Sequence, residues 1–371
     1  MEYDYIVVGA GFFGATFAQQ MKEHGRCVLV IDRRDHIGGN SYSADDPATG
    51  IDVPRYGTHV FHTCDNALWR YVTRFTQFNQ YHHRVLTTHR GCVYSLPVNL
   101  GTINSFFGVH LRPGEAKEFL GARSERLDEP TSFEEKAVSE IGRELYAALF
   151  KGYSQKQWGR DPKELPAATV ARLPVRYSYD DSYFTDPYQG IPIDGYGALF
   201  QRMLEGIEVQ LEADFFADES YWRSQAKKLV YTGPLDRFFG FTAGRLSWRA
   251  VRFESERISQ EDFQGTAVMN FADLEVPYTR IHEPKHLHPE RHGPSGTTLI
   301  VREYPYDDQD SAAYPVNSIH DAAVLSAYRS LAAAESRVIF GGRLAEYRYY
   351  DMGQAVGSAL ATVRAELTSS A

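Results

Sequence analysis

The stretch YIVVGAGFFGATFAQQ near the start of the sequence constrains the fold more than any other feature. Gly9, Gly11 and Gly14 fit the spacing GxGxxG between a β-rich run and a helical pattern, so the turn can be tight and the amide end of the helix can face a pyrophosphate. A second apolar run ends at Asp32, about twenty residues on, where a carboxylate accepts the ribose hydroxyls of an adenine nucleotide. The sequence therefore predicts a βαβ dinucleotide-binding unit.

A second glycine pair distinguishes between the two common dinucleotides. Gly38, Gly39 and Asn40 follow the ribose position and bring the backbone close to the ligand again, which suits the long pyrophosphate and ribityl chain of FAD better than NAD. YTGP at 231–234 and FGGRLAEYRYYDMGQ at 340–354 look like later segments of the glutathione-reductase-like flavin fold. No second GxGxxG follows a strand, so we predict FAD without a separate nicotinamide-binding domain.

Composition narrows the class of partner. The 24 tyrosines exceed what packing needs and favour flat ligands or sugars. With a net charge of -9, and with Lys and Arg spread along the chain, a nucleic-acid partner is not expected. No uncharged apolar run reaches the roughly 20 residues of a membrane helix, and the start lacks a signal region. We expect no membrane partner and a cytoplasmic protein.

The three cysteines indicate neither a metal site nor a disulfide framework. Cys27, Cys64 and Cys92 form no CxxC pair and no metal-binding spacing. Their sparse, odd number suits a reducing compartment. We therefore predict no metal, and we interpret all three as small buried apolar residues.

Hydrophobic periodicity changes along the chain. Residues 133–150 place Ala137, Ile141, Leu145 and Leu149 on one face of a helix. The segment LVYTGPLDRFF, 229–239, is typical of a buried strand that returns to the first sheet. The last segment predicts a strand, a glycine pair and a helix with Asp351 as its N-cap; Val356, Leu360 and Val363 would point inward.

These patterns predict an α/β fold, in which a Rossmann-like FAD-binding domain carries a helical insert and an antiparallel β-sheet domain. The FAD-binding domain is discontinuous. We assign to it 1–78, 194–240 and 317–371, to the helical domain with a substrate lid nearby 102–169, and to the antiparallel sheet domain 79–101, 170–193 and 241–316.

Seven motifs carry a resemblance that spans nearly the whole chain. They are HIGGNSY (36–42), YGTHVFHT (56–63), KGYSQKQWGR (151–160), ARLPVRYSYDDSYFTDPYQGIP (171–192), NFADLEVPYTRIHEPKH (270–286), YPVN (314–317) and GGRLAEYRYYDM (341–352). In these motifs the chain resembles the bacterial UDP-galactopyranose mutases, flavoenzymes that interconvert the six-membered and five-membered ring forms of UDP-galactose.

The resemblance implies a nucleotide-sugar site. Tyr153 and Trp158 match residues that hold the uracil, and Asn270 matches another residue at the nucleotide end. Arg172, on a mobile lid, and Arg280 match two arginines that clamp the pyrophosphate, a role suited to forked guanidinium groups. The tyrosines that bond the phosphates and line the sugar pocket are matched by Tyr183, Tyr314 and Tyr349.

The resemblance also implies residues around the flavin. His62 matches a histidine that responds to the flavin redox state, and His59 lies in the same segment, where a structural role stays open. Arg343 and Asp351 match residues near the ring and the ribityl chain, and Met352 would contribute its backbone.

In the family, reduced FAD is the active form. Flavin N5 attacks the anomeric carbon, UDP leaves but stays bound, and the sugar opens as a covalent flavin adduct. The ring recloses through O4 in place of O5, UDP reattaches, and no electrons are consumed. Dimerisation is common among bacterial relatives, so a homodimer is compatible with the resemblance, although no stretch of the sequence indicates an interface.

Some positions depart from the family pattern. Ala313 in QDSAAYP, 309–315, replaces an aromatic residue, His282 and Pro284 differ from some relatives, and HHRV at 82–85 stands where others carry an amide. These departures concern the sugar more than the reaction. The alternatives are a mutase for a 6-deoxy or thymidine-linked nucleotide sugar, a net-redox flavin oxidase on the same fold, and a catalytically idle nucleotide-sugar binding protein.

Overall fold

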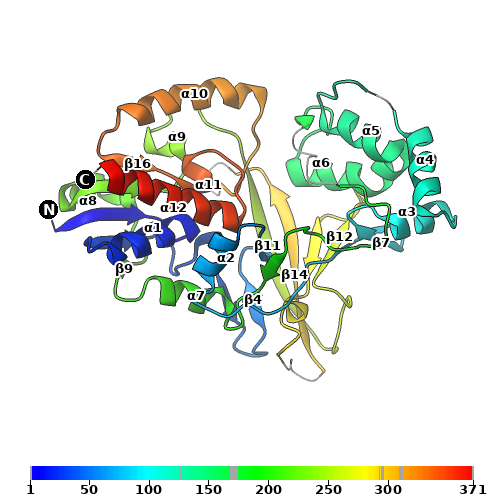
Figure 1. The fold of residues 1–371 in the computed structure, drawn as a ribbon, viewed down its shortest axis with the longest axis horizontal. Helices are drawn as coiled ribbons and strands as arrows, with labels where there is room; N and C mark the ends of the chain where they lie inside the picture. The colour runs from blue at the N-terminus through cyan, green and yellow to red at the C-terminus, as the bar shows by residue number, and fades with distance from the viewer. Residues whose placement is uncertain are drawn as a thin grey trace.

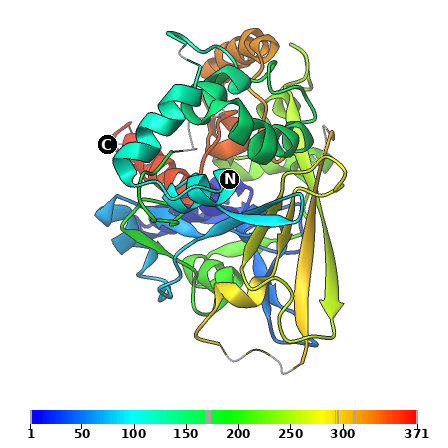
Figure 2. The same cartoon turned by 90° about the vertical axis from the view of Figure 1, so that its right-hand side faces the viewer.

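The computed structural model describes residues 2–125, 127–167, 174–291, 293, 296–308 and 312–369. Two large sheets organise this part of the chain. The parallel sheet and its helices lie at one end of the molecule in Figure 1, and the strands of the second sheet lie between them and a group of helices. In Figure 2 that group of helices and the second sheet face the viewer.

Five strands form the parallel sheet, in the spatial order β16 (Val338–Phe340), β10 (Ala226–Tyr231), β1 (Tyr3–Val8), β2 (Val28–Ile31) and β9 (Glu208–Gln210). Every neighbouring pair is parallel. All four residues of β2 are buried, as expected of a strand covered on both faces. The strand predicted within 229–239 does return to this sheet, because β10 pairs with β1.

Two helices from opposite ends of the chain pack together beside this sheet, α1 (Phe12–Glu23) and α12 (Met352–Ser369) (Figure 1). Val356 and Val363 of α12 are buried as predicted, whereas Leu360 is only partly buried. The Asp351 carboxylate accepts a 2.7 Å hydrogen bond from Gln354 N, which confirms the predicted N-cap.

Seven strands form the second sheet, in the order β15 (Tyr314–Pro315), β11 (Trp248–Ile258), β14 (Thr298–Tyr306), β13 (Arg280–His282), β12 (Val268–Phe271), β6 (Val85–His89) and β7 (Cys92–Leu96). Its pairs are antiparallel except β12 with β6, which is parallel. The strands expected over 170–193 are largely wrong. In the described part of that stretch, only β8 (Tyr188–Gly190) forms, and it pairs with β5 (Phe61–Thr63) instead of this sheet.

The group of helices contains α3 (Leu100–Phe107), α4 (Pro113–Arg123), α5 (Phe133–Leu145), the π-helical turn η2 (Tyr146–Lys151) and α6 (Gly152–Trp158). Ala137, Ile141, Leu145 and Leu149 are all buried, as their spacing predicted. The single helix expected over 133–150 is interrupted, because Gly142 has a φ of 77° and the backbone after α5 is wound as a π-helix. α6 therefore begins directly where η2 ends.

The remaining elements connect these parts. They are η1 (Gly39–Ser41), β3 (Ser43–Asp45), β4 (Asp52–Pro54), α2 (Asn66–Val72), α7 (Gly195–Met203), η4 (Phe215–Ala217), α8 (Glu219–Gln225), α9 (Leu235–Phe238), η5 (Pro284–Leu287), α10 (Ile319–Ala334) and α11 (Gly342–Ala345). Among the helices of the described ranges, none is both long and apolar enough to cross a membrane.

The prediction that the cysteines are buried is wrong. Cys27, Cys64 and Cys92 are all exposed free thiols. Each lies at an end of a strand: before β2, after β5 and at the first position of β7. The apolar run after Cys27 is buried as β2, whereas Val93 next to Cys92 is itself exposed.

Candidate functional site

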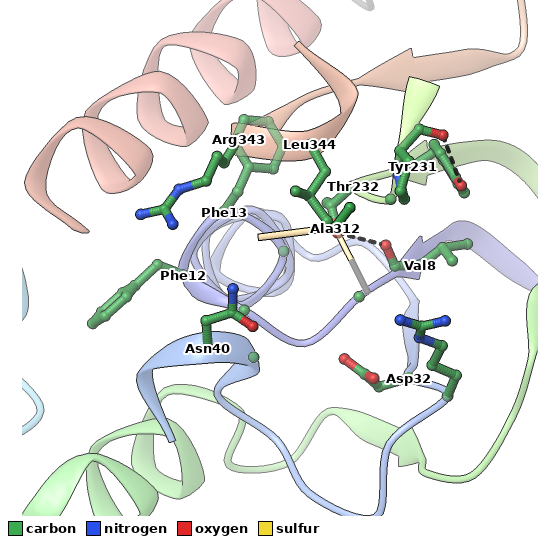
Figure 3. Close-up of a pocket in the computed structure, with 18 of the residues that line it drawn as sticks. Val8, Phe12, Phe13, Asp32, Asn40, Tyr231, Thr232, Ala312, Arg343 and Leu344 are labelled. Atoms are coloured by element: carbon green, nitrogen blue, oxygen red, sulfur yellow. Dashed lines mark hydrogen bonds between the residues drawn. The ribbon is translucent and has the colours of Figure 1, made fainter. Parts of the chain in front are cut away.

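One cavity gathers all ten residues predicted to bind the cofactor. It opens at the carboxyl ends of β1, β2, β10 and β16, the edge at which parallel α/β sheets bind ligands. Figure 3 shows Asp32 and Asn40 on one side of the N-terminal turn of α1 and Arg343 on the other. The ten residues in its lining are Gly9, Gly11, Gly14, Asp32, Gly39, Asn40, His59, Arg343, Asp351 and Met352.

The glycine turn is built for close backbone approach. A Cβ added to Gly14 would lie 2.0 Å from the Gly9 carbonyl oxygen, so no larger residue fits there. A Cβ on Gly39, whose φ is +57°, would lie 3.0 Å from Gly11 Cα. The backbone of the second glycine pair therefore packs directly against that of the first glycine turn. Gly11 is the N-cap of α1 and has no side chain to cap it. The first amides of α1 are therefore left for a ligand, and the cradle fits a dinucleotide pyrophosphate.

Asp32 fixes this loop while facing the cavity. Its Oδ2 accepts a 2.8 Å hydrogen bond from Ala10 N, and its Oδ1 accepts one of 3.0 Å from Arg34 N. The Arg34 guanidinium also donates to Asn40 Oδ1 at 2.7 Å. A carboxylate has about four lone-pair sites, so Asp32 retains acceptor capacity for ribose hydroxyls.

Arg343 connects the cavity with two predicted substrate residues. Its Nη2 and Nε donate to the Tyr350 carbonyl oxygen at 2.5 and 3.1 Å. Its guanidinium carbon lies 5.4 Å from the ring centroid of Tyr314 and 5.3 Å from that of Tyr349, and the two rings stack 5.6 Å apart. Burial and the neighbouring Tyr349 raise the pKa of Tyr314 to about 12, so its hydroxyl stays a hydrogen-bond donor.

A second cluster forms around Arg280 at the start of β13. Its Nε donates to Asn270 Oδ1 on β12 at 3.2 Å, and its guanidinium carbon lies 5.6 Å from the ring centroid of Tyr153 on α6. The Tyr153 hydroxyl is buried and has no hydrogen-bond partner among the described residues. A buried hydroxyl without a partner is costly, so this cluster offers both a cation and an open donor to a ligand.

Glu303, on β14, is the carboxylate that faces Arg280 in this cluster. Its Oε2 lies 3.5 Å from Arg280 Nη1 and 3.1 Å from His282 Nε2, and its Oε1 accepts from Thr279 Oγ1 at 3.1 Å. Burial would raise the pKa of Glu303, but Arg280 and His282 lower it to about 2. In turn, although burial opposes the charge of Arg280, Glu303 helps to hold the pKa of Arg280 well above its usual value.

The His62 side chain lies away from the cofactor cavity. Its Nδ1 is 2.5 Å from Asp186 Oδ2, and its ring stacks on Phe184 with 3.7 Å between centroids. His62 does not belong to the cavity lining within the described residues. Its carbonyl oxygen instead approaches the start of α12, where a Cβ on Gly353 would lie 2.9 Å from it.

The remaining predicted residues are less tightly connected. Tyr183 packs edge-on against His83 with 5.3 Å between ring centroids. Tyr183 is also close enough to Tyr153 and Arg280 to help raise the pKa of each. Trp158 ends α6 and packs against the main hydrophobic core. Arg172 lies outside the described residues.

Comparison with known proteins places the chain. The UDP-galactopyranose mutase family model matches residues 148–349, and a model of the NAD(P)-binding Rossmann-like domain matches residues 7–75. A probable UDP-galactopyranose mutase of Klebsiella pneumoniae is 43% identical over 370 residues, which cover 98% of this chain and 94% of that protein. The chain belongs to the UDP-galactopyranose mutase family.

Two further similarities refine this assignment. A dTDP-fucopyranose mutase of Escherichia coli is 38% identical over 364 residues, 96% of each protein. A crystal structure of reduced UDP-galactopyranose mutase superposes with a TM-score of 0.80 at 15% identity, covering 99% of this chain and 94% of that one. The latter likeness shows that the fold is that of a UDP-galactopyranose mutase.

Sequence reasoning did not single out Glu303 or Asp186 as members of this mutase's site, and it noted His83 only within HHRV, 82–85, as a departure from the family pattern. Glu303 had a detectable signal, because it alternates with Leu299 and Val301 on the inward face of β14, where an isolated carboxylate is unexpected. Asp186 had no such signal, because it is one of several acidic residues in its loop. Its partner His62 lies 124 positions away in the sequence.

Proposed function

We propose that this protein is a UDP-galactopyranose mutase, which interconverts UDP-galactopyranose and UDP-galactofuranose with FAD in its reduced form and without net redox change. Family membership over nearly the full chain supports the reaction. The single structural observation that carries it is the cluster of Arg280, Tyr153 and Asn270 next to a glycine-turn cavity suited to a dinucleotide.

The ten cavity residues would hold FAD. The Asp32 carboxylate would bind the adenosine ribose, the first turn of α1 the pyrophosphate, and Arg343 and Asp351 the half nearer the flavin ring. When bound and reduced, the flavin supplies a nucleophilic nitrogen that can displace the nucleotide from the sugar.

The chain's own residues handle the nucleotide. Tyr153 and Trp158 would contact the uracil, and Asn270 would also lie at the nucleotide end. Tyr183, Tyr314 and Tyr349 would line the phosphates and the sugar. Breaking the anomeric bond leaves negative charge on the diphosphate, and the permanently charged Arg280 would stabilise it in a partly buried site, where such contacts are strong. Arg172, carried by a lid, would supply the second cation and help to exclude water.

His62 enters this proposal through its carbonyl and its pairing with Asp186. The Asp186 contact and the Phe184 stack fix the ring, so the backbone at His62 is held against α12, which begins at Met352. His59 is partly exposed in the cavity wall. Desolvation together with the Arg343 charge lowers its pKa to about 4, so its ring stays neutral there.

A second candidate is a mutase for a thymidine-linked 6-deoxy sugar. Two observations favour it: the 38% identity to a dTDP-fucopyranose mutase, and His83 at a position near Tyr183 where an amide was expected. A 6-deoxy sugar lacks the C6 hydroxyl of galactose, so a pocket that binds it needs a different set of hydrogen-bonding side chains.

Three broader proposals accompany this function. We place the protein in the cytoplasm, where nucleotide sugars are used, and we propose a homodimer as its assembly. The division into an FAD-binding domain, a helical domain and a sheet domain also stands as a proposal. The described residues 174–193 add no strand to the seven-stranded sheet.

The direct test incubates the purified yellow protein with UDP-galactofuranose, with and without dithionite, and follows UDP-galactopyranose by chromatography. Conversion only after reduction, with many turnovers per added electron, is the expected result. The same assay with dTDP-fucofuranose compares the two candidates by their ratio of kcat/KM. Stoichiometric consumption of reductant or production of peroxide would instead indicate net redox chemistry.

A further inference from the structure

Helix α6 is joined to the β12–β13 hairpin by the half-buried side chain of Lys156. The Lys156 ammonium donates to four carbonyl oxygens, those of Phe271 and Asp273 at 2.8 Å and those of Val276 and Tyr278 at 2.9 Å. An ammonium has three protons to donate, so four carbonyl acceptors are enough to occupy all of them. All four belong to the connection between β12 and β13, or to the residue that starts it.

This connection separates two predicted substrate residues. Asn270 and Arg280 face each other as a pair in the antiparallel ladder of β12 and β13, and the chain between them forms the loop that Lys156 holds. Lys156 itself lies on the same short helix as Tyr153, three residues away. One side chain therefore connects the helix that would bind the base with the hairpin that would bind the diphosphate.

Two other contacts fix the same helix. A Cβ on Gly152 would lie 2.3 Å from the Ala272 carbonyl oxygen, so the start of α6 lies directly against the end of β12. At the other end, the buried Arg249 of β11 donates to the carbonyl oxygens of Gln157 at 2.9 Å and Lys156 at 3.1 Å. A cation is favourable at these last carbonyls of a helix.

We propose that Lys156 is a positioning residue, which holds the base-binding helix α6 and the diphosphate-binding hairpin β12–β13 in one fixed geometry, so that a nucleoside diphosphate binds to both as one unit. This inference rests on the proposed function. Linked fragments bind more tightly than separate ones only when both of their subsites are correctly spaced. Removing Lys156 leaves each subsite with its own residues but loosens their spacing.

The test compares three ligands on the flavin-loaded protein. Dissociation constants are measured for UDP, which spans both subsites, for UMP, which includes the base, and for inorganic pyrophosphate, which includes only the charged groups. In Lys156→Met, UDP should bind roughly tenfold more weakly, while UMP and pyrophosphate change by less than about threefold, because only the linked ligand depends on the spacing. Lys163→Met removes an exposed lysine just beyond α6 and should leave all three constants unchanged.

Other results would contradict the proposal. Equal weakening of all three ligands would mean that Lys156 only stabilises the fold, and unchanged UDP binding would mean that the contact has no role in binding. If Lys156→Met does not fold, Lys156→Gln keeps two N–H donors without the charge, and it should show a smaller loss confined to UDP. If the wild-type protein itself does not bind UDP, the proposed function is wrong and this inference falls with it.

Discussion

The Arg280 guanidinium carbon lies 5.6 Å from the centre of the Tyr153 ring, while Arg280 Nε donates to Asn270 at 3.2 Å. Asn270 and Arg280 come from the adjacent strands β12 and β13, whereas Tyr153 comes from α6, more than a hundred residues earlier in the sequence. Because the Tyr153 hydroxyl has no hydrogen-bond partner in the described part of the chain, the arrangement is complete only when a ligand supplies an acceptor. The predictions below test this cluster and the cofactor cavity separately.

Arg280→Ala should abolish most of the turnover and leave the flavin bound. Loss of one preorganised cation at a developing charge typically reduces kcat roughly 100- to 1,000-fold, and Arg280 is absent from the cavity lining among the described residues. Turnover of UDP-galactofuranose and the visible absorbance of bound flavin are the measurements. Arg302→Ala, which removes an arginine paired with exposed Glu256, is the matched control; near-wild-type rates in Arg280→Ala would exclude Arg280 from the mechanism. The same assay applies to Arg172→Ala, for which we expect the same loss.

Gly14→Ala should prevent folding of the cofactor domain, whereas Gly11→Ala should fold but bind flavin weakly. The added Cβ at Gly14 would lie 2.0 Å from a carbonyl oxygen, but at Gly11 the nearest atom outside its own chain neighbours is 3.8 Å away. Expression as folded protein, followed by flavin content after dialysis, distinguishes the two. Gly121→Ala, where a Cβ meets nothing, is the control. A soluble, flavin-loaded Gly14→Ala would contradict the close packing of this turn.

Asp351→Asn separates two roles of one residue. Asparagine caps a helix as well as aspartate does, so the free energy of unfolding should change little, whereas Asp351→Ala should lower it by about 1 kcal/mol. If the carboxylate charge also contacts the cofactor, both variants should lose flavin affinity. Urea unfolding and flavin titration provide the two readouts. Full flavin affinity in Asp351→Asn would restrict Asp351 to its role as a cap.

The buried His83 should make the protein sensitive to mild acid. Burial, followed by the Arg280 charge, lowers the pKa of His83 to about 3. The unfolded chain therefore takes up a proton on His83 as the pH falls below about 6.5, while the folded protein does not. The contribution of His83 to the free energy of unfolding is therefore fully present above about pH 6.5 and is lost as the pH falls toward 3. Between pH 7 and 4.5 we expect a loss of about 2 kcal/mol from this residue. His83→Asn should show a smaller loss over the same range, and an identical pH dependence would contradict the neutral state of His83.

The sequence predicted those parts of the fold that depend on local pattern alone. The turn between β1 and α1, the strand β10 and the Asp351 cap all follow from glycine spacing, apolar runs and capping chemistry. The interruption at Gly142 and the π-helical turn were not predicted, because apolar spacing over 133–150 is the same whether or not the backbone remains α-helical.

Contacts between distant segments set the limit of that reasoning. The pairing of β8 with β5 was missed because strands of only three residues do not reveal their partner. The four carbonyls around Lys156 lie at least 115 positions away in the sequence, and a lysine in a polar helix gives no sign of such an enclosure. For the site residues, chemical type and motif predicted which side chains matter, and only the structure shows that Glu303 lies against Arg280.

The order β16-β10-β1 has a consequence for synthesis of the chain. β1 emerges from the ribosome first, but its neighbour β10 follows more than two hundred residues later and β16 later still. At about 5 to 20 residues per second, the glycine turn waits tens of seconds for the strands that complete its cavity. Thr232, Arg343 and Asp351, which also line the cavity, appear equally late. Loading of the cofactor is therefore a step that follows translation, and a nascent chain stopped before residue 338 should remain colourless.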